Sequence, residues 1–102
     1  MNKKFSKKNF IEELYIIIHQ RAKNKSSNSY TNKLLNQGSK KIAQKIGEES
    51  TELIIDYLNG TKKRILEETA DLIYHMVVML YSKKITIKSL ESELKKRRLN
   101  VR

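Results

Sequence analysis

Two pairs of carboxylates in the middle of this chain have a spacing suited to holding a cation. Each pair is three positions apart: Glu49 with Glu52, and Glu68 with Asp71. If each segment is helical, the two members of a pair share one face of their helix. Carboxylates gathered in this way raise one another's pKa unless a cation neutralises them. The spacing therefore predicts a metal site, although such pairs are also frequent on solvated helix faces.

The charge distribution points to the same region. The protein carries a formal net charge of +11, yet seven of its eleven acidic residues lie in the 24 residues from Glu48 to Asp71. That window has a net charge of −4, and the rest of the chain has +15. An acidic segment inside a basic chain favours a cation site over a face that is only solvated.

Apolar residues on both sides of Gly60 recur at helical spacing, which predicts two helices. Gly60 is a plausible end for the first helix, and Thr61 a plausible N-cap for the second. The apolar positions are Ile42, Ile46, Leu53, Ile54 and Tyr57 in the first helix, and Ile65, Leu66, Leu72, Ile73, Met76, Val77 and Leu80 in the second.

The turn between these helices decides which carboxylates meet. If the helices form an antiparallel hairpin about Gly60, residues equally far from the turn lie at the same height. Glu52 then faces Glu68, and Glu49 faces Asp71. Oxygen-only ligands favour a hard ion, and Mg²⁺ commonly shares its coordination with substrate phosphates. The predicted ion is therefore Mg²⁺ rather than zinc.

Three further runs of sequence carry a family resemblance. They are Ser29-Tyr30-Thr31, the run Lys-Ile-Ala-Gln-Lys-Ile-Gly-Glu-Glu at 41–49 and the run Ala-Asp-Leu-Ile-Tyr-His at 70–75. Together with the acidic pairs they resemble the phosphoribosyl-ATP pyrophosphatases, enzymes of the second step of histidine biosynthesis in the all-α NTP pyrophosphohydrolase superfamily. The acidic pairs are typical of the whole superfamily, whereas the three runs together are much more specific. The resemblance covers about residues 10–98.

The resemblance implies Mg²⁺-dependent hydrolysis of 1-(5-phosphoribosyl)-ATP to 1-(5-phosphoribosyl)-AMP and pyrophosphate. It also implies that Glu48 is a neighbouring acid that assists as ligand, as support for a ligand or as base. The Mg²⁺ ligands that it implies are Glu49, Glu52, Glu68 and Asp71. Two other functions stay open at this point: a pyrophosphohydrolase of the same superfamily acting on a noncanonical NTP, and a non-catalytic basic helical binding protein.

Six residues near the acidic pairs are candidates for substrate binding. The resemblance suggests Tyr30, Thr31 and Lys33. Position beside the acidic face suggests Lys41, Lys45 and His75. Each has a structural alternative. Thr31 can cap a helix, Tyr30 can pack, the lysines can be solvated, and His75 can be a structural partner of the carboxylates.

Along the whole chain, the pattern predicts a single all-α domain of residues 1–102 with about four helices. They span about 7–23, 31–58, 62–82 and from 87 onward, with Gly38 as a potential interruption of the second. Ser6 and Thr86 are the expected caps of the first and last helices. The inward positions of the first helix are Phe10, Ile11, Leu14, Ile17 and Ile18.

Composition limits the remaining functions. The basic residues are dispersed, 17 of the 22 are lysines, and no nucleic-acid-binding motif is recognisable, so no specific nucleic-acid partner is expected. The absence of cysteine excludes a disulfide scaffold and fits a reducing compartment. No stretch resembles a signal peptide or approaches the ~20 apolar residues of a membrane span, so a cytoplasmic protein is expected.

Chain length bears on partners. Four helices in 102 residues bury a limited area, so we expect a homodimer or a larger assembly. The related family often occurs fused behind a phosphoribosyl-AMP cyclohydrolase domain, for which this chain has no room. A separate cyclohydrolase is therefore the expected next enzyme.

Overall fold

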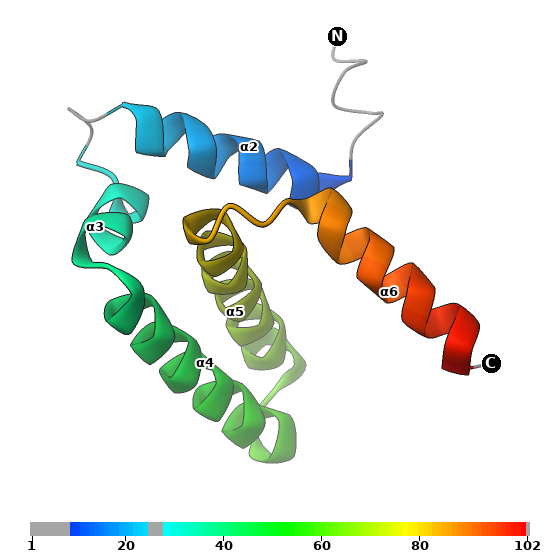
Figure 1. Ribbon diagram of the computed structural model, residues 1–102. Helices are drawn as coiled ribbons and strands as arrows, with labels where there is room; N and C mark the ends of the chain where they lie inside the picture. The colour runs from blue at the N-terminus through cyan, green and yellow to red at the C-terminus, as the bar shows by residue number, and fades with distance from the viewer. Residues whose placement is uncertain (1–8, 25–27, 102) are drawn as a thin grey trace, which may run out of the picture.

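The computed structural model describes residues 9–24 and 28–101, which are all-α and contain no strand (Figure 1). The prediction of an all-α fold is confirmed. Within this described part of the chain, five helices take the place of the four expected, because the second is divided at Gly38. The helices are α2 (Phe10–Lys23), α3 (Tyr30–Gln37), α4 (Ser39–Asn59), α5 (Lys62–Ser82) and α6 (Ile87–Val101).

Gly38 breaks the second predicted helix because of its backbone conformation. Its φ of +90° lies in a region that residues with a Cβ rarely adopt. Its N–H closes α3 on the carbonyl of Leu34, and its own carbonyl accepts the N–H groups of Lys41 and Ile42 at the start of α4. The change of direction sets α3 at an angle to α4, so that α3 also contacts α5.

The first helix begins later than predicted. Asn9 is its cap, with Oδ1 accepting the backbone N–H of Glu12 at 2.8 Å. The expected cap Ser6 and the expected first residue Lys7 lie outside the described residues. The inward placement of Phe10 is wrong, since this side chain is 67% exposed. As the first residue of α2, it has no preceding helical turn to cover it.

The hairpin agrees with the sequence. Asn59 ends α4, Gly60 follows with its N–H on the carbonyl of Asp56, and Thr61 caps α5 by accepting the N–H of Arg64. The helices α4 and α5 lie antiparallel and pack together more extensively than any other described pair (Figure 1). This pair carries all four carboxylates of the predicted site.

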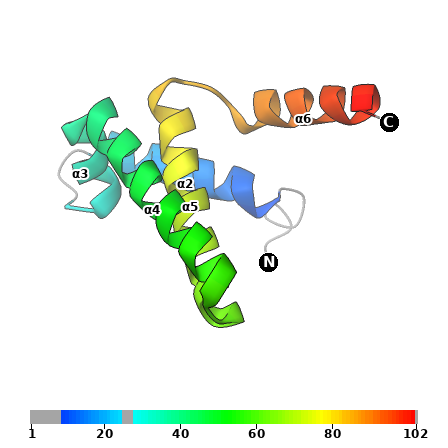
Figure 2. The ribbon, with the colours of Figure 1, turned by 90° about the horizontal axis from the view of Figure 1, so that it is seen from below.

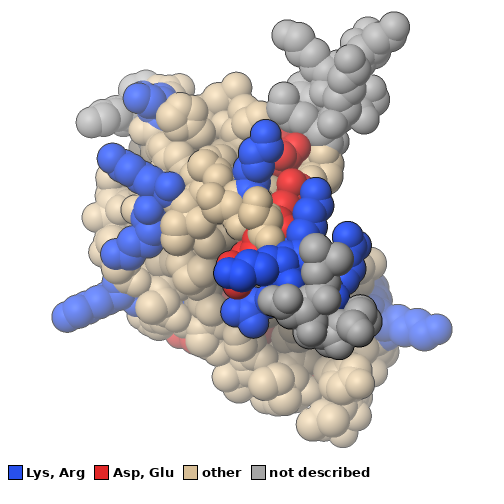
Figure 3. Space-filling view, turned by 45° about the vertical axis from the view of Figure 1, so that its right-hand side comes forward, with Lys and Arg blue, Asp and Glu red and all other residues tan. Residues whose placement is uncertain are grey.

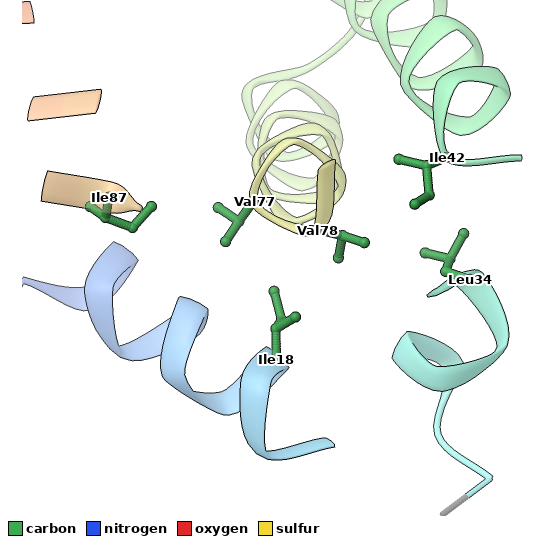
Figure 4. Packing of buried hydrophobic residues seen from close by; sticks show 6 residues of the cluster. All are labelled: Ile18, Leu34, Ile42, Val77, Val78 and Ile87. Carbon is green, nitrogen blue, oxygen red and sulfur yellow. The ribbon is translucent and has the colours of Figure 1, made fainter. Parts of the chain in front are cut away.

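The core joins the other helices to the end of the hairpin far from Gly60. Ile18 of α2 points toward Val77 and Val78 of α5, beside contributions from α3, α4 and α6 (Figure 4). The six buried apolar residues are Ile18, Leu34, Ile42, Val77, Val78 and Ile87. The core therefore fixes α3 against the hairpin, one to two helical turns from the carboxylates.

The last helix projects from the body (Figure 2). Thr86 caps it as predicted, with its hydroxyl accepting the N–H of Ser89. Ile87 packs into the core near α2, whereas Leu94 is 57% exposed. Among the described helices, none is long and apolar enough to cross a membrane.

Candidate metal centre

Three carboxylates converge across the hairpin. Glu49 comes from α4, and Glu68 and Asp71 come from α5. One carboxylate oxygen from each lies within 4.8 Å of those of the other two. We call these three residues the acidic cluster. Glu49 and Asp71 thus meet as the predicted register requires.

Two oxygens of the acidic cluster are buried without a partner. Glu49 and Glu68 are only 8% and 5% exposed. Among the described residues, neither Glu49 Oε1 nor Glu68 Oε1 has a hydrogen-bond donor. Burying a carboxylate oxygen without a donor is costly, and a bound cation would offset that cost. The donor set consists of carboxylate oxygens alone, which fits Mg²⁺ or another hard cation.

Glu52 and Glu48 lie at the edge of this arrangement. Glu52 is exposed and lies close enough to Glu68 for its charge to raise the pKa of that carboxyl, in agreement with the predicted register, but it is not among the three residues with converging oxygens. Glu48 is exposed, accepts a hydrogen bond from Gln44 at 2.9 Å and pairs with Lys45 at 3.7 Å. The hydrogen bond from Gln44, aided by the lysine charges, lowers the pKa of Glu48. The structure therefore brings Glu52 to the rim of the cluster and turns Glu48 away from it.

Burial raises the pKa of the Glu68 carboxyl. The charge of Glu52, and a hydrogen bond with it, raise this pKa further, while the guanidinium of Arg64 opposes the shift. Glu68 therefore holds its negative charge at a cost in free energy. Arg64 was not among the predicted site residues, although its position four residues before Glu68 is the spacing of a helical ion pair.

His75 is fixed between α3 and the acidic cluster. Its Nδ1 lies 2.8 Å from the backbone carbonyl of Asp71, so this nitrogen carries the proton and donates it to that oxygen. Nε2 then accepts the hydroxyl of Tyr30 at 2.9 Å. The imidazole is 5% exposed and stacks edge-on against Tyr30 and Tyr74. The geometry gives His75 the structural role that the sequence left open, linking Tyr30 to the backbone of a cluster residue.

Thr31 is held in the same network and does not cap its helix. Ser29 is the cap of α3, with Oγ accepting the N–H of Asn32 at 3.1 Å. Thr31 lies one position inside the helix, has no exposed surface and hydrogen bonds to the hydroxyl of Tyr74. This contact was not foreseen, because only the folded chain brings α3 to α5.

The remaining candidates lie nearer to solvent. Tyr30 is 48% exposed; burial raises its pKa, with the charges of Lys45, Glu49 and Asp71 also acting on it. Its ring therefore stands beside the acidic cluster. Lys33 is exposed on α3, and Lys41 and Lys45 are half-buried on α4. Tyr30 and Lys45 thus lie near the cluster.

The raised pKa of Glu68 predicts a pH dependence for the metal-free protein. A carboxyl with a folded pKa above its ordinary value of 4.5 contributes stability that is fully present below pH 4.5 and is lost as pH rises through the folded pKa. Glu68→Gln keeps an acceptor for Arg64 but removes the titrating group. We therefore expect the free energy of unfolding of this variant to depend less on pH in this range. Urea unfolding between pH 4 and 7 without divalent cations measures it. Glu93→Gln on α6 is the control, and an equal flattening there would contradict the assignment.

Comparison with known proteins finds similar sequences over most of the chain. The model of the family described as "Phosphoribosyl-ATP pyrophosphohydrolase" matches residues 11–98. The phosphoribosyl-ATP pyrophosphatase of Clostridium novyi (strain NT) is 45% identical over 91 residues, covering 89% of this chain and 83% of that protein. The enzyme of the same name from Sulfolobus acidocaldarius is 43% identical over 89 residues, covering 87% and 94%. A histidine biosynthesis bifunctional protein HisIE of Bacteroides thetaiotaomicron is 46% identical over 88 residues, which cover 86% of this chain and 43% of that protein.

Proposed function

This chain belongs to the phosphoribosyl-ATP pyrophosphohydrolase family of hydrolases, and we propose that it cleaves phosphoribosyl-ATP with Mg²⁺ held by the acidic cluster. The products are phosphoribosyl-AMP and pyrophosphate, in the second step of histidine biosynthesis. The observation that carries the proposal is the pair of buried, unpartnered oxygens on Glu49 and Glu68 within the described part of the chain. In this proposal Glu52, whose charge acts on Glu68 from the rim of the cluster, completes the set of ligands.

The reaction places defined demands on these residues. Water adds across the α–β phosphoanhydride, one P–O bond forms and another breaks, and a proton of the water passes to a base. Glu49, Glu68 and Asp71 supply converging negative oxygens, from two buried side chains and one exposed one, which are suited to holding a cation against phosphates. Bound Mg²⁺ would act there as a Lewis acid and neutralise the charge that develops on the pyrophosphate. A carboxylate of the site accepts the proton.

Basic and aromatic groups beside the cluster provide the substrate contacts in this proposal. Lys41 and Lys45 precede Glu49 on α4, and Lys33 and Tyr30 lie on α3. Thr31 acts indirectly, through its contact with Tyr74, and His75 acts by holding Tyr30. On the face shown in Figure 3, most charged side chains are lysine or arginine, with a few acidic ones among them. The net charge of +11 favours the approach of a substrate with four phosphates.

A substrate panel tests the proposal. Pyrophosphate release is measured with Mg²⁺ for phosphoribosyl-ATP, ATP, dATP and a noncanonical triphosphate such as ITP. We expect the highest kcat/KM for phosphoribosyl-ATP. A preference for ITP would instead assign the chain to nucleotide-pool hydrolysis, and no turnover of any of them would contradict both. The expected product is then a substrate for a separate phosphoribosyl-AMP cyclohydrolase.

We also propose that the functional form is a homodimer or larger, in which the 102-residue chain acts as one domain. The turn end of the hairpin leaves large apolar side chains more than half exposed, and two of them, Ile54 and Tyr57, belong to the apolar pattern that predicts the first helix of the hairpin. The radius of gyration is 15.4 Å, compared with about 13 Å for a compact domain of this length. A second copy that covers these side chains would account for both their exposure and the extended shape of the single chain. The exposed side chains are Ile54, Ile55, Tyr57, Leu58 and Leu66.

Charging this surface should therefore separate the subunits. Leu66 is 71% exposed in the single chain, so Leu66→Lys costs little within it but places a charge in the interface. We expect light scattering to give at least twice the 12.0 kDa chain mass for the wild type and a smaller mass for the variant. The control is Asn36→Lys, which adds a charge at an exposed position on α3. A fully active wild-type monomer at high micromolar concentration would contradict the proposal.

A further inference from the structure

Arg64 is the basic side chain tied most closely to the acidic cluster. Its Nη2 donates to Glu68 Oε2 at 2.7 Å and lies 3.6 Å from Asp56 Oδ2, and its Nη1 donates to Glu67 Oε1 at 3.2 Å. Among the described residues, no other basic group lies within ion-pair distance of Glu49, Glu68 or Asp71. The contact with Asp56 crosses from α5 to α4. Arg64 therefore joins a candidate metal ligand to both helices of the hairpin.

The two oxygens of Glu68 have different surroundings. Arg64 engages Oε2, whereas Oε1 is buried and has no hydrogen-bond partner within residues 9–24 and 28–101. Glu68 as a whole is only 5% exposed, so the carboxylate has little freedom to turn. One oxygen is thus held back from the cluster, and the other is the one left to bind an ion.

The position of Arg64 is itself fixed by the turn. Asp56, whose side chain is 20% exposed, forms an ion pair at 3.6 Å with Nη2, the same nitrogen that donates to Glu68. Its other oxygen, Oδ1, would lie 2.8 Å from a Cβ placed on Gly60, so Gly60 leaves the space that Asp56 occupies. The planar guanidinium thus binds Glu68 through Nη2 and Glu67 through Nη1 while it stays paired with Asp56, whereas an ammonium is a point charge without such a fork.

We propose that Arg64 is a positioning residue that makes Glu68 a one-oxygen ligand and thereby favours Mg²⁺ over Ca²⁺ at the acidic cluster. This inference rests on the proposed Mg²⁺ site. Calcium takes six to eight oxygens and often both oxygens of one carboxylate, whereas magnesium takes six at shorter distances in a stricter geometry. Holding Glu68 Oε2 on Arg64 withdraws the second oxygen that calcium would use.

A role limited to charge gives a different expectation. If Arg64 only offsets the repulsion among the carboxylates, Lys at this position should serve equally well. Under the positioning role, Arg64→Lys keeps the charge but loses the fork that binds Glu67 and Glu68 at the same time. The preference between two divalent ions is the suitable readout, because a general loss of stability would weaken the binding of both.

Calorimetric titration of the metal-free full-length protein with MgCl₂ and with CaCl₂ tests the proposal. We expect the ratio of the calcium to the magnesium dissociation constant to fall by about tenfold in Arg64→Lys, the scale on which residues that orient a metal ligand act. Asp56→Asn, which loosens Arg64 without removing it, should shift the ratio in the same direction and serves if the first variant does not fold. The control is Arg97→Lys, since Arg97 pairs with Glu93 within α6. This variant should leave the ratio unchanged.

The outcomes distinguish the positioning role of Arg64 from the proposed Mg²⁺ site on which it rests. A wild type that binds Mg²⁺, with an unaltered ratio in Arg64→Lys and Asp56→Asn, would overturn the positioning role and leave the metal site standing. A wild type that binds neither ion would overturn both. A ratio that falls in these two variants but not in Arg97→Lys supports the assignment.

Discussion

Replacing Asp71 by alanine is expected to abolish Mg²⁺-dependent turnover while the helical fold persists. Asp71 supplies one of the three converging oxygens, and its exposed side chain makes no packing contribution to the core. The loss should exceed the roughly 10- to 100-fold typical of residues that only orient a metal ligand. Steady-state pyrophosphate release gives the activity, and far-UV circular dichroism verifies the fold.

The same substitution should leave the metal-free protein at least as stable. Removing one negative charge from a repelling cluster relieves the repulsion on Glu49 and Glu68. Glu52→Ala should also abolish turnover, since its carboxylate lies at the rim of the cluster beside Glu68 and is the fourth proposed ligand. Glu93→Ala provides a matched control, because Glu93 is a half-exposed carboxylate that pairs with Arg97 on α6. Full activity in Asp71→Ala would remove the basis of the metal assignment.

Local signals in the sequence were sufficient to predict the hairpin. Gly60 and Thr61 act on their immediate neighbours, and apolar spacing identifies helices without knowledge of what they pack against. Once the turn is known, the geometry of an antiparallel pair places Glu49 opposite Asp71 and Glu52 opposite Glu68. The candidate site could therefore be predicted because all its carboxylates flank one short turn.

Contacts between distant helices could not be predicted in this way. The bond between Tyr30 and His75 joins residues 45 positions apart, and it depends on the angle that Gly38 imposes between α3 and α4. The observed cap of α3 differs from the predicted one for another reason. Several polar residues precede each helix, and Ser29 rather than Thr31 has the extended backbone that a cap requires.

Periodicity also fails to say which chain covers an apolar face. Ile54 and Tyr57 have the spacing of core residues, yet they are 59% and 72% exposed in the single chain. The same spacing would arise whether the covering surface belonged to this chain or to a second copy. The arginine beside Glu68 was overlooked for the opposite reason, since helical ion pairs are so common on exposed faces that spacing alone assigns them no special role.

Magnesium is expected to stabilise the folded protein far more than a monovalent salt does. Without a cation, the buried oxygens of Glu49 and Glu68 lie beside Asp71 with no donor among the described residues. An ion that binds only the folded state adds about 2.7 kcal/mol to the free energy of unfolding at a hundred times its dissociation constant. NaCl at matched ionic strength screens the repulsion but provides no directional ligand, so its effect should be much smaller.

The measurement is a set of thermal unfolding curves in MgCl₂ and in NaCl, each with and without pyrophosphate. The largest shift should occur with MgCl₂ and pyrophosphate together, since Mg²⁺ favours mixed carboxylate and phosphate coordination. Asp71→Ala should lose most of the response to MgCl₂ and keep the response to NaCl, because it removes a ligand but leaves the overall charge of +11 almost unchanged. Equal shifts in the two salts for the wild type, whether or not pyrophosphate is present, would mean that the carboxylates form only a solvated acidic face.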